Sequence, residues 1–319
     1  MTGLACRRRP GEDWDVGTWE RGIVPAPFVS IGVPVYNGER FLARALASLC
    51  AQDVDGLEIV ISDSASNDGT PDIARDVAAQ DPRVAYHPTP HRLAMWENFR
   101  RAFALSSGEW FHWACHDDLL EPDYVRRCLQ VAADHPGTVS VVTATREFND
   151  TGDTVRTVVE RLPGSDHADP RRRMRAVLWH LCEGASTGLA FHRASALART
   201  SRISNVPQSD RLLGAELALL GRLVTVDKVL QHRYQGDVHL QREDWSWLDF
   251  RNASRPYRPL RRQIGAHVRL LGETSWPARS RRRIAAEIPL AIGAWKVRSK
   301  LEFELRRRAA MASTTPQPA

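Results

Sequence analysis

Residues 29–64 read VSIGVPVYNGERFLARALASLCAQDVDGLEIVISDS, and this stretch decides the fold. It opens with an apolar, β-branched run that ends at an Asn-Gly pair, a pattern typical of a buried strand followed by a turn. Residues 39–52 then place apolar side chains at helical spacing, and residues 57–64 form a second strand-like run. A strand, a helix and a second strand in succession predict the repeating unit of an α/β sheet with parallel strands.

The same alternation continues downstream. Strand-like runs at 83–88, 109–115 and 139–145 alternate with helical patterns at 70–80, 95–108 and 122–136. We therefore predict a Rossmann-like, doubly wound α/β sheet with mostly parallel strands. The second half of the chain is less regular, and there we expect helices near 169–184 and 209–222 and strands near 223–234.

Composition divides the chain into three parts. Residues 1–26 are polar and predict a flexible leader, without the apolar core that a secretory signal peptide needs. Residues 27–248 hold the α/β pattern, regular over 27–150 and less regular over 151–248. Residues 249–319 predict a basic helical extension with a disordered polar end.

Basic charge is concentrated in the C-terminal part. Residues 251–310 carry 16 of the 44 basic side chains and 4 of the 38 acidic ones, whereas the whole chain has a net charge of +6. Two interpretations are open: a helical extension with solvated arginines, or a peripheral contact with an anionic membrane. The segment lacks the aromatic motifs and the recognition helix of nucleic-acid modules, so we expect no nucleic-acid partner.

Cysteine usage indicates a reducing compartment. The five cysteines are scattered, none forms a C-x-x-C pair, and their number is odd. A disulfide framework or a zinc site is therefore not indicated, and no apolar run reaches the length of a membrane span. We expect a cytoplasmic protein, with any membrane contact at the inner face of the membrane.

Two adjacent carboxylates, Asp117 and Asp118, follow the strand-like run at 109–115. Ligands of doubly wound sheets bind beyond the carboxyl ends of the strands, so this is where binding residues are expected. One carboxylate there often caps a helix, but two in a row repel each other unless a cation or hydrogen-bond donors compensate. Mg²⁺ and Mn²⁺ favour a few carboxylates together with phosphate oxygens, so the pair suits a metal–diphosphate site.

Polar residues also follow the first two strands. Asp63 and Ser64 belong either to a turn that links strand to helix or to a site that hydrogen-bonds a nucleobase or ribose. Pro34 and Tyr36 either pack at the end of the first strand or line a base pocket. Neither a G-x-G-x-x-G nor a P-loop motif occurs, so a glycine-rich phosphate cradle is not indicated.

Four segments, in this order, resemble the family 2 inverting glycosyltransferases of the GT-A fold. They are VSIGVPVYNGERFLARALASLCAQ, IVISDSASNDGT, SSGEWFHWACHDDLLEPDYV and SDRLLGAELALLGR, and the resemblance covers roughly Phe28 to His239. It implies a GT-A fold with a nucleotide-binding half at about 27–150 and an acceptor half at about 151–248.

The resemblance also implies roles for individual residues. The stretch HDD matches the family's DxD-type motif, which makes Asp118 the metal ligand, for Mg²⁺ or Mn²⁺, and places Asp117 near the donor ribose or sugar. Nucleotide or donor contacts are implied for the positions that match the family's binding blocks: Pro34, Tyr36, Asp63, Ser64 and Asn98.

The chain departs from the family pattern at three positions. Many members have a second acid where Ser64 stands and a glycine where Leu93 stands. Many also carry Arg-x-His after the last strand, whereas this chain has Gln235 there, so His239 or His232 is the replacement to consider. These departures leave the donor nucleotide open and favour an alternative function, a GT-A-like protein that binds a sugar nucleotide or glycan without chemistry.

Inversion requires a base that deprotonates the acceptor hydroxyl as it attacks. The candidate is Asp210, which precedes a helical pattern, and the alternative is a simple helix cap by Ser209 or Asp210. Glu183 is a second acid for the acceptor side. The resemblance therefore implies a metal-dependent transferase that moves a sugar from a nucleotide-sugar donor to a glycan or lipid-linked acceptor, in polysaccharide or cell-envelope biosynthesis.

Overall fold

The computed structural model describes residues 29–159, 162–180, 187–206, 209–235 and 258–294. The predicted leader lies outside these residues, and so does the polar C-terminal end.

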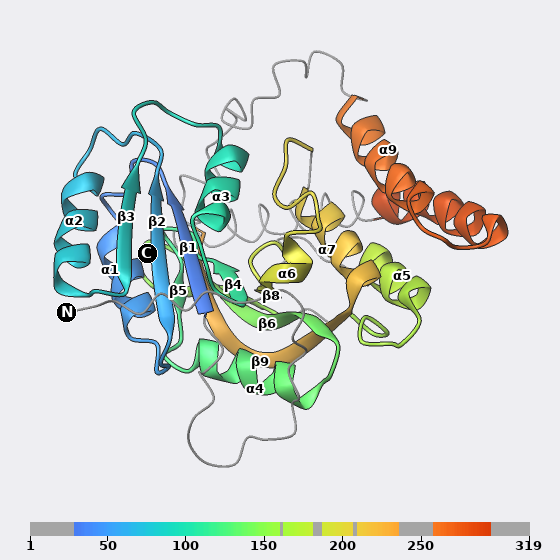
Figure 1. Cartoon of the computed structure of the whole chain (residues 1–319), viewed down its shortest axis with the longest axis horizontal. Helices are drawn as coiled ribbons and strands as arrows, with labels where there is room; N and C mark the ends of the chain where they lie inside the picture. Colours follow the sequence, from blue (N-terminus) through green and yellow to red (C-terminus); the bar gives the residue numbers. More distant parts are fainter. Residues whose placement is uncertain (1–28, 160–161, 181–186, 207–208, 236–257, 295–319) are drawn as a thin grey trace, which may run out of the picture.

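The described strands form one nine-stranded sheet in the order β3-β2-β1-β4-β8-β6-β9-β5, with β7 paired to β6 (Figure 1). Neighbours from β3 to β4 run parallel, as do β6 and β9, whereas β8 is antiparallel to both β4 and β6. The doubly wound, mostly parallel sheet predicted from the alternation is therefore confirmed. The strands are β1 Val29–Val35, β2 Leu57–Asp63, β3 Val84–Pro88, β4 Trp110–Trp113, β5 Leu119–Leu120, β6 Thr138–Phe148, β7 Thr154–Val158, β8 Phe191–Arg193 and β9 Arg222–Tyr234.

Helices cover both faces of the sheet (Figure 1). Apolar residues of α1, α2 and α4 pack into one hydrophobic cluster with β1, β2 and β3, and those of α3, α5, α6, α7 and α9 pack into a second cluster. Helices α1 and α4 each bury one apolar stripe, so their 3.6-residue spacing predicted their positions, whereas α7 is buried on most sides. The helices are α1 Leu42–Cys50, α2 Thr70–Gln80, α3 Met95–Ala104, α4 Tyr124–Asp134, α5 Pro170–His180, α6 Ala194–Leu197, α7 Ser209–Leu220 and α9 Arg258–Gly272.

The central strand β1 contains a proline, which cannot donate a hydrogen bond to a sheet. The amide of Ser64 donates to the Val35 carbonyl at 2.9 Å, so Val35 faces β2 and its neighbour Pro34 faces the β4 side. Pairing of β1 with β4 ends at Gly32, before Pro34 is reached. Because Pro34 lies beyond the paired residues, its missing N–H removes no hydrogen bond between β1 and β4. The end of β1 therefore stays unpaired on the side that faces β4.

The short strand β5 brings two distant parts of the chain together. Leu119 pairs with His232 of β9, so the end of β9 lies beside the residues that precede β5. Those residues are Asp117 and Asp118. The C-terminal ends of β4 and β9 are thereby held close together.

The basic C-terminal segment is helical where it is described, as α9 and as residues 278–294. In Figure 1 these orange helices lie at the opposite end of the molecule from β3. Leu271 and Ile288 are buried in the second hydrophobic cluster, and Arg175 of α5 pairs with Glu287 at 2.8 Å. The segment thus packs on the body of the protein. Among the described helices, none combines the length and the apolar character that crossing a membrane requires.

Two buried histidines in the sheet predict acid sensitivity. Burial lowers the pKa of His112 to about 4 and that of His192 to about 3, so both stay neutral in the folded state. Below pH 6.5 the unfolded chain binds protons that the folded chain does not. We expect the free energy of unfolding to fall by up to about 1.4 kcal/mol per pH unit for each histidine, from pH 6.5 down to roughly 4.

Urea unfolding at half-unit pH steps measures this slope. Neither ring nitrogen of His192 has a well-formed hydrogen bond among the described residues, so His192→Leu removes the titration at little cost in hydrogen bonding. We expect that variant to lose about half of the slope. An unchanged slope in His192→Leu would show that other groups cause the acid sensitivity.

Candidate active site

The loops that follow β1 and β2 are hydrogen-bonded to each other. The amide of Gly38 donates to Thr70 Oγ1 at 2.7 Å, and the amide of Asn67 donates to Asn37 Oδ1 at 3.0 Å. Asn37 has a φ of 50°, a left-handed conformation that asparagine tolerates better than most residues. The carboxyl edge of the sheet therefore carries a fixed double loop.

Asp63 ends β2 inside this double loop and is 1% exposed. Its Oδ1 accepts from the Ser66 amide at 3.0 Å and from the Ser66 hydroxyl at 2.6 Å, and its Oδ2 accepts from the Tyr86 hydroxyl at 2.7 Å. Burial, with the Asp63 hydrogen bond second, raises the pKa of Tyr86. Asp63 therefore anchors the turn that follows β2, and contact of its carboxylate with a nucleotide stays a prediction.

Ser64 and Asn98 hold the ends of the strands in place through hydrogen bonds. The Ser64 hydroxyl accepts from the Leu93 amide at 2.7 Å, while Asn98 Nδ2 donates to the carbonyls of Ser62 at 2.9 Å and Val35 at 3.2 Å. Both residues are buried. Each therefore has a positioning role, and direct contact of either with a nucleotide stays a prediction.

Pro34 and Tyr36 differ in their surroundings. Pro34 is buried within β1, so its role in this fold is to end the pairing toward β4. Tyr36 lies just past the strand and is half-buried. The guanidinium carbon of Arg92 lies 4.1 Å from the centre of the Tyr36 ring, a cation–π contact at the rim of the site.

Asp117 and Asp118 form the acidic centre of the site. Their carboxylates and the Cys115 thiol place ligand atoms within 4.8 Å of one another. Asp118 Oδ1 accepts from the Tyr234 amide at 3.1 Å, and its Oδ2 lies 3.9 Å from Arg233 Nε. Burial and then the charge of Asp117 raise the pKa of Asp118 to about 7, against the opposing effect of Arg233.

This donor set fits a hard divalent cation. Carboxylate oxygens are the protein ligands of Mg²⁺ and Mn²⁺, and such ions take their remaining ligands from water and phosphate. Burial and the two aspartates raise the pKa of Cys115, and a thiolate is in any case a soft ligand that Mg²⁺ and Mn²⁺ do not favour. Asp117 and Asp118 are therefore the residues that would hold the ion.

Asp210 lies in the first turn of α7 and is half-buried. Burial raises its pKa, with Arg211 and, more weakly, Arg233 opposing the rise. Arg233 therefore acts electrostatically on both Asp210 and Asp118. That Asp210 and Asp118 act in one site stays a prediction.

Arg233 is the functional residue that sequence reasoning missed. It is the second-to-last residue of β9, and its side chain is 19% exposed. In the run HRYQ, sequence reasoning addresses only the absent histidine at Gln235. The pairing of β5 with β9 is what places this cation beside Asp118, and no local pattern signals that pairing.

His232 does not replace the absent histidine. Its Nδ1 accepts from Arg146 Nε at 3.0 Å, and its Nε2 lies 2.7 Å from Glu121 Oε1. Both ring nitrogens are used within the protein, which argues against His232 as the replacement for that histidine. The other two candidates, His239 and Glu183, lie outside the described residues.

Gly188 is packed against the candidate base, which makes it a test of the site's geometry. A Cβ added there would lie 3.1 Å from the Asp210 Cβ, so Gly188→Val should displace the Asp210 side chain. We expect turnover to fall about 100-fold, because a misplacement near 1 Å can cost that much, while nucleotide binding is unchanged. Steady-state kinetics and nucleotide titration check this, and a fully active variant would show that Asp210 tolerates movement.

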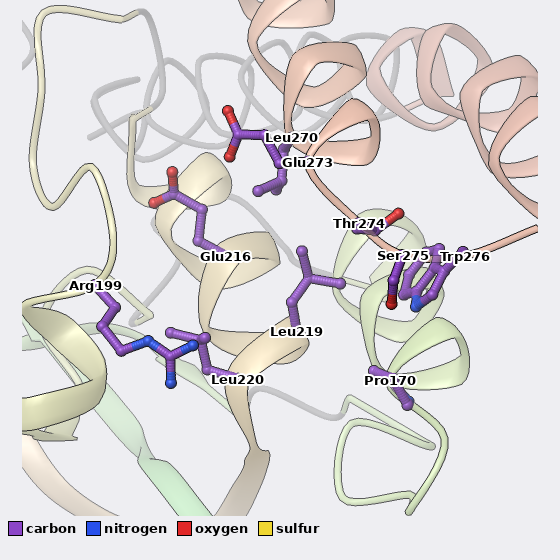
Figure 2. Close-up of a pocket in the computed structure, with 10 residues that line it drawn as sticks. All are labelled: Pro170, Arg199, Glu216, Leu219, Leu220, Leu270, Glu273, Thr274, Ser275 and Trp276. Carbon is purple, nitrogen blue, oxygen red and sulfur yellow. The ribbon is translucent and has the colours of Figure 1, made fainter.

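A cavity of about 500 Å³ lies elsewhere, between α5, α7 and α9 (Figure 2). Glu216 and Glu273 line one part of it, and Trp276 lies on another side. Among the described residues that line this cavity, none is predicted for the active site. The strand-tip site and this cavity are therefore separate features.

Comparisons with known proteins identify the family and the fold. The family model for glycosyl transferase family 2 matches residues 30–198. Among curated proteins, EpsH of Bacillus subtilis is 35% identical over 130 residues, which are 40% of this chain and 37% of EpsH. Chondroitin synthase of Escherichia coli is 27% identical over 171 residues, 51% of this chain and 25% of that protein. The chain thus matches well under half the length of these relatives.

Solved structures show the same fold. S. aureus TarS, residues 1–349 in complex with UDP-GlcNAc, has a TM-score of 0.60 at 17% identity over 82% of this chain and 71% of that one. The mannosyltransferase PcManGT of Pyrobaculum calidifontis, in complex with GDP-Man and Mn²⁺, has a TM-score of 0.54 at 19% identity over 94% of this chain and 81% of that one. With the fold and the family model in agreement over more than half of its length, this chain belongs to glycosyl transferase family 2.

Proposed function

We propose that this protein is a metal-dependent, inverting glycosyltransferase. It moves a sugar from a nucleotide-sugar donor to a hydroxyl of a glycan or lipid-linked acceptor, in polysaccharide or cell-envelope biosynthesis. The acidic pair at the carboxyl edge of the sheet is the observation that carries the proposal: Asp117 and Asp118 place carboxylate oxygens within 4.8 Å of each other, and Arg233 Nε lies 3.9 Å from Asp118 Oδ2. The site has the charges that inverting transfer requires: an acid pair for a cation, a cation for a leaving group, and a half-buried base.

The donor nucleotide lies along the tips of β1 and β2. Asp63 offers its carboxylate to a ribose or base, and Tyr36 offers a ring face beside Arg92. Asp117 lies toward the donor sugar. Solved relatives of this fold bind UDP-GlcNAc or GDP-Man, and both nucleotides have the ribose and diphosphate that these residues would contact.

The diphosphate leaves at the acidic centre. Asp118, with Asp117 beside it, would hold Mg²⁺ or Mn²⁺, and the bound ion would supply positive charge to stabilise a departing diphosphate. Arg233 adds a fixed positive charge next to Asp118. The positive charge of Arg233 also lowers the pKa of Asp210, so one cation acts both on the leaving-group side of the site and on the proposed base.

Asp210 takes the proton from the acceptor hydroxyl. Burial raises its pKa, which makes the carboxylate a stronger base than a solvated aspartate. The Thr187 hydroxyl donates to the Asp210 carbonyl at 3.3 Å and Gly188 packs on its side chain, so the base is held by a second segment of the acceptor half. Attack on the face opposite the diphosphate gives inversion.

The proposal is tested by donor turnover. The full chain is incubated separately with UDP-, GDP-, dTDP- and CMP-sugars, with Mn²⁺ or with EDTA, and released nucleotide is measured. We expect release from one donor class, dependent on metal and abolished by Asp118→Asn. Tight binding of a sugar nucleotide with no release, even with mixed glycan acceptors, would instead support the non-catalytic alternative that Ser64, Leu93 and Gln235 suggest.

A further inference from the structure

Three arginines from separate elements meet at the segment 201–206, which joins α6 to α7. Arg100 of α3 donates to the Ser201 carbonyl at 3.4 Å, and Arg262 of α9 donates to the Asn205 carbonyl at 2.7 Å. The third, Arg202, lies within the segment, and its guanidinium carbon is 5.5 Å from the centre of the Phe103 ring.

The printed partners of these arginines are uncharged. Within the described residues, Arg100 and Arg262 donate to carbonyls and Arg202 lies against an aromatic ring, and no carboxylate pairs with any of the three guanidinium groups. Burial lowers the pKa of Arg202, and the nearby charge of Arg100 lowers it further, so the two cations repel each other. Uncompensated like charges are costly away from bulk water, and a bound anion removes that cost.

The same segment buries polar atoms that lack partners. Arg202 Nε, Ser204 Oγ and Asn205 Oδ1 are all buried with no hydrogen-bond partner among the described residues. Buried polar atoms in folded proteins are nearly always satisfied by protein, water or ligand. Two of these atoms carry donors and suit an oxyanion, and the third is an acceptor that suits a sugar hydroxyl beside it.

The backbone of Arg202 has an unusual conformation that the neighbouring residues hold in place. Its φ of 55° is a left-handed conformation that is strained for a residue with a long side chain. The amide and the hydroxyl of the preceding Ser201 both donate to Glu216 Oε2 at 2.9 Å, which fixes the start of the segment to α7. The strain is therefore stabilised by bonds on its N-terminal side.

The segment adjoins the candidate base. A Cβ added at Gly188 would lie 3.5 Å from Ile203 Cδ1 and 3.1 Å from the Asp210 Cβ, so Ile203 and Asp210 line the same small space. Ile203 directly follows Arg202, so the segment that carries Arg202 also contacts the space beside Asp210. This is the side from which an acceptor approaches, because the diphosphate lies at Asp118.

We propose that Arg100, Arg202 and Ser204 bind an oxyanion carried by the acceptor, a phosphate ester or a sugar carboxylate, next to the hydroxyl that is glycosylated. This inference rests on the proposed transferase function, since it assigns the acceptor side of the same site. It specifies an anionic acceptor, whereas the residues at the strand tips specify only the donor. Asn205 accepts a hydroxyl of the sugar that carries the anion.

The test measures binding to the metal-free full chain in EDTA by isothermal titration. The probes are inorganic phosphate, glucose 1-phosphate, glucuronate and neutral methyl glucoside. We expect the three anions to bind and methyl glucoside not to bind. A preference for the phosphates would identify a phosphate-bearing acceptor, and a preference for glucuronate would identify a uronate-bearing one.

Three variants locate the site. Arg202→Gly removes the guanidinium and relieves the backbone strain, and Arg100→Gln removes the second charge; each should weaken anion binding at least 10-fold. Arg199→Gln, which changes an exposed arginine just after α6 and outside the cluster, should leave it unchanged. Equal anion binding by wild type and Arg202→Gly would overturn the proposal.

Failure of this inference is distinguishable from failure of the proposed function. Release of nucleoside diphosphate from donors reports the transferase without reference to the acceptor anion, and anion binding in EDTA reports the arginine site without a donor. Donor turnover with no anion binding overturns only the acceptor proposal. Anion binding without donor turnover overturns only the enzymatic function.

Discussion

Replacing Asp210 by Asn is expected to lower kcat by roughly 10²- to 10⁴-fold, the range typical of a lost general base. The amide is close in size to the carboxylate and keeps the start of α7 intact, but it cannot take a proton from the acceptor hydroxyl. Donor affinity should stay within about twofold, because Asp210 affects the diphosphate only through its electrostatic interaction with Arg233. Steady-state kinetics and nucleotide titration of both proteins provide the measurement.

A pH profile separates the base from a helix cap. Because burial raises the pKa of Asp210, the ionised base is lost as pH falls through that raised value, and wild-type kcat should rise with pH across it. Ser209→Ala tests the capping alternative: if a cap is all this turn provides, that variant loses about 1 kcal/mol of stability and keeps its kcat. An Asp210→Asn enzyme with near-normal turnover would remove Asp210 from the base role.

Replacing Asp118 by Asn is expected to abolish the stimulation of donor turnover by Mg²⁺ or Mn²⁺, with a loss of about 10² or more. Metal stabilisation of a leaving group contributes several kcal/mol to the transition state, and each 1.36 kcal/mol is a factor of about ten. The amide oxygen of the new side chain can still accept from the Tyr234 amide, so the end of β9 should hold. Metal titration of nucleotide release measures the effect.

The same substitution should not destabilise the fold. The pKa of Asp118 is raised to about 7, mainly by burial and by the charge of Asp117, so its ionised form is unfavourable near neutral pH in the metal-free protein. A neutral amide removes that repulsion, and we expect the thermal midpoint to stay level or rise. Cys115→Ala is the matched control: since a thiolate is a soft ligand that Mg²⁺ and Mn²⁺ do not favour, that variant should retain metal stimulation. Loss of stimulation in the control but not in Asp118→Asn would transfer the ligand role to Cys115.

The first half of the fold could be predicted from local pattern, and the reason is physical. Strands β1, β2 and β4 are parallel and buried on both faces, which requires continuous apolar runs, whereas the edge strand β3 is only partly buried. The same logic predicted polar residues at the strand tips, and Asp63 and the Asp117–Asp118 pair lie there. A strict period and short connections leave few other arrangements.

The rest could not be predicted because it depends on long-range pairing. Strand β8 inserts antiparallel between β4 and β6, and β9 runs parallel to β6 with irregular register. The bond between the Tyr234 amide and Asp118 joins residues 116 positions apart. Arg233 owes its place to that pairing, and the bracing roles of Ser64 and Asn98 depend on partners in other elements.

The two hydrophobic clusters on opposite faces of the sheet have a consequence for how such a chain can diverge. Among the described residues, none belongs to both clusters, so substitutions in one should change stability independently of substitutions in the other. The helices around Asp210 and the arginine segment belong to one cluster, whereas α1 and α2, beside the nucleotide loops, belong to the other. Substitutions on the proposed acceptor face can therefore accumulate without changing the packing beside the nucleotide loops. Recombination between relatives should be tolerated where the residues of one face are exchanged as a set.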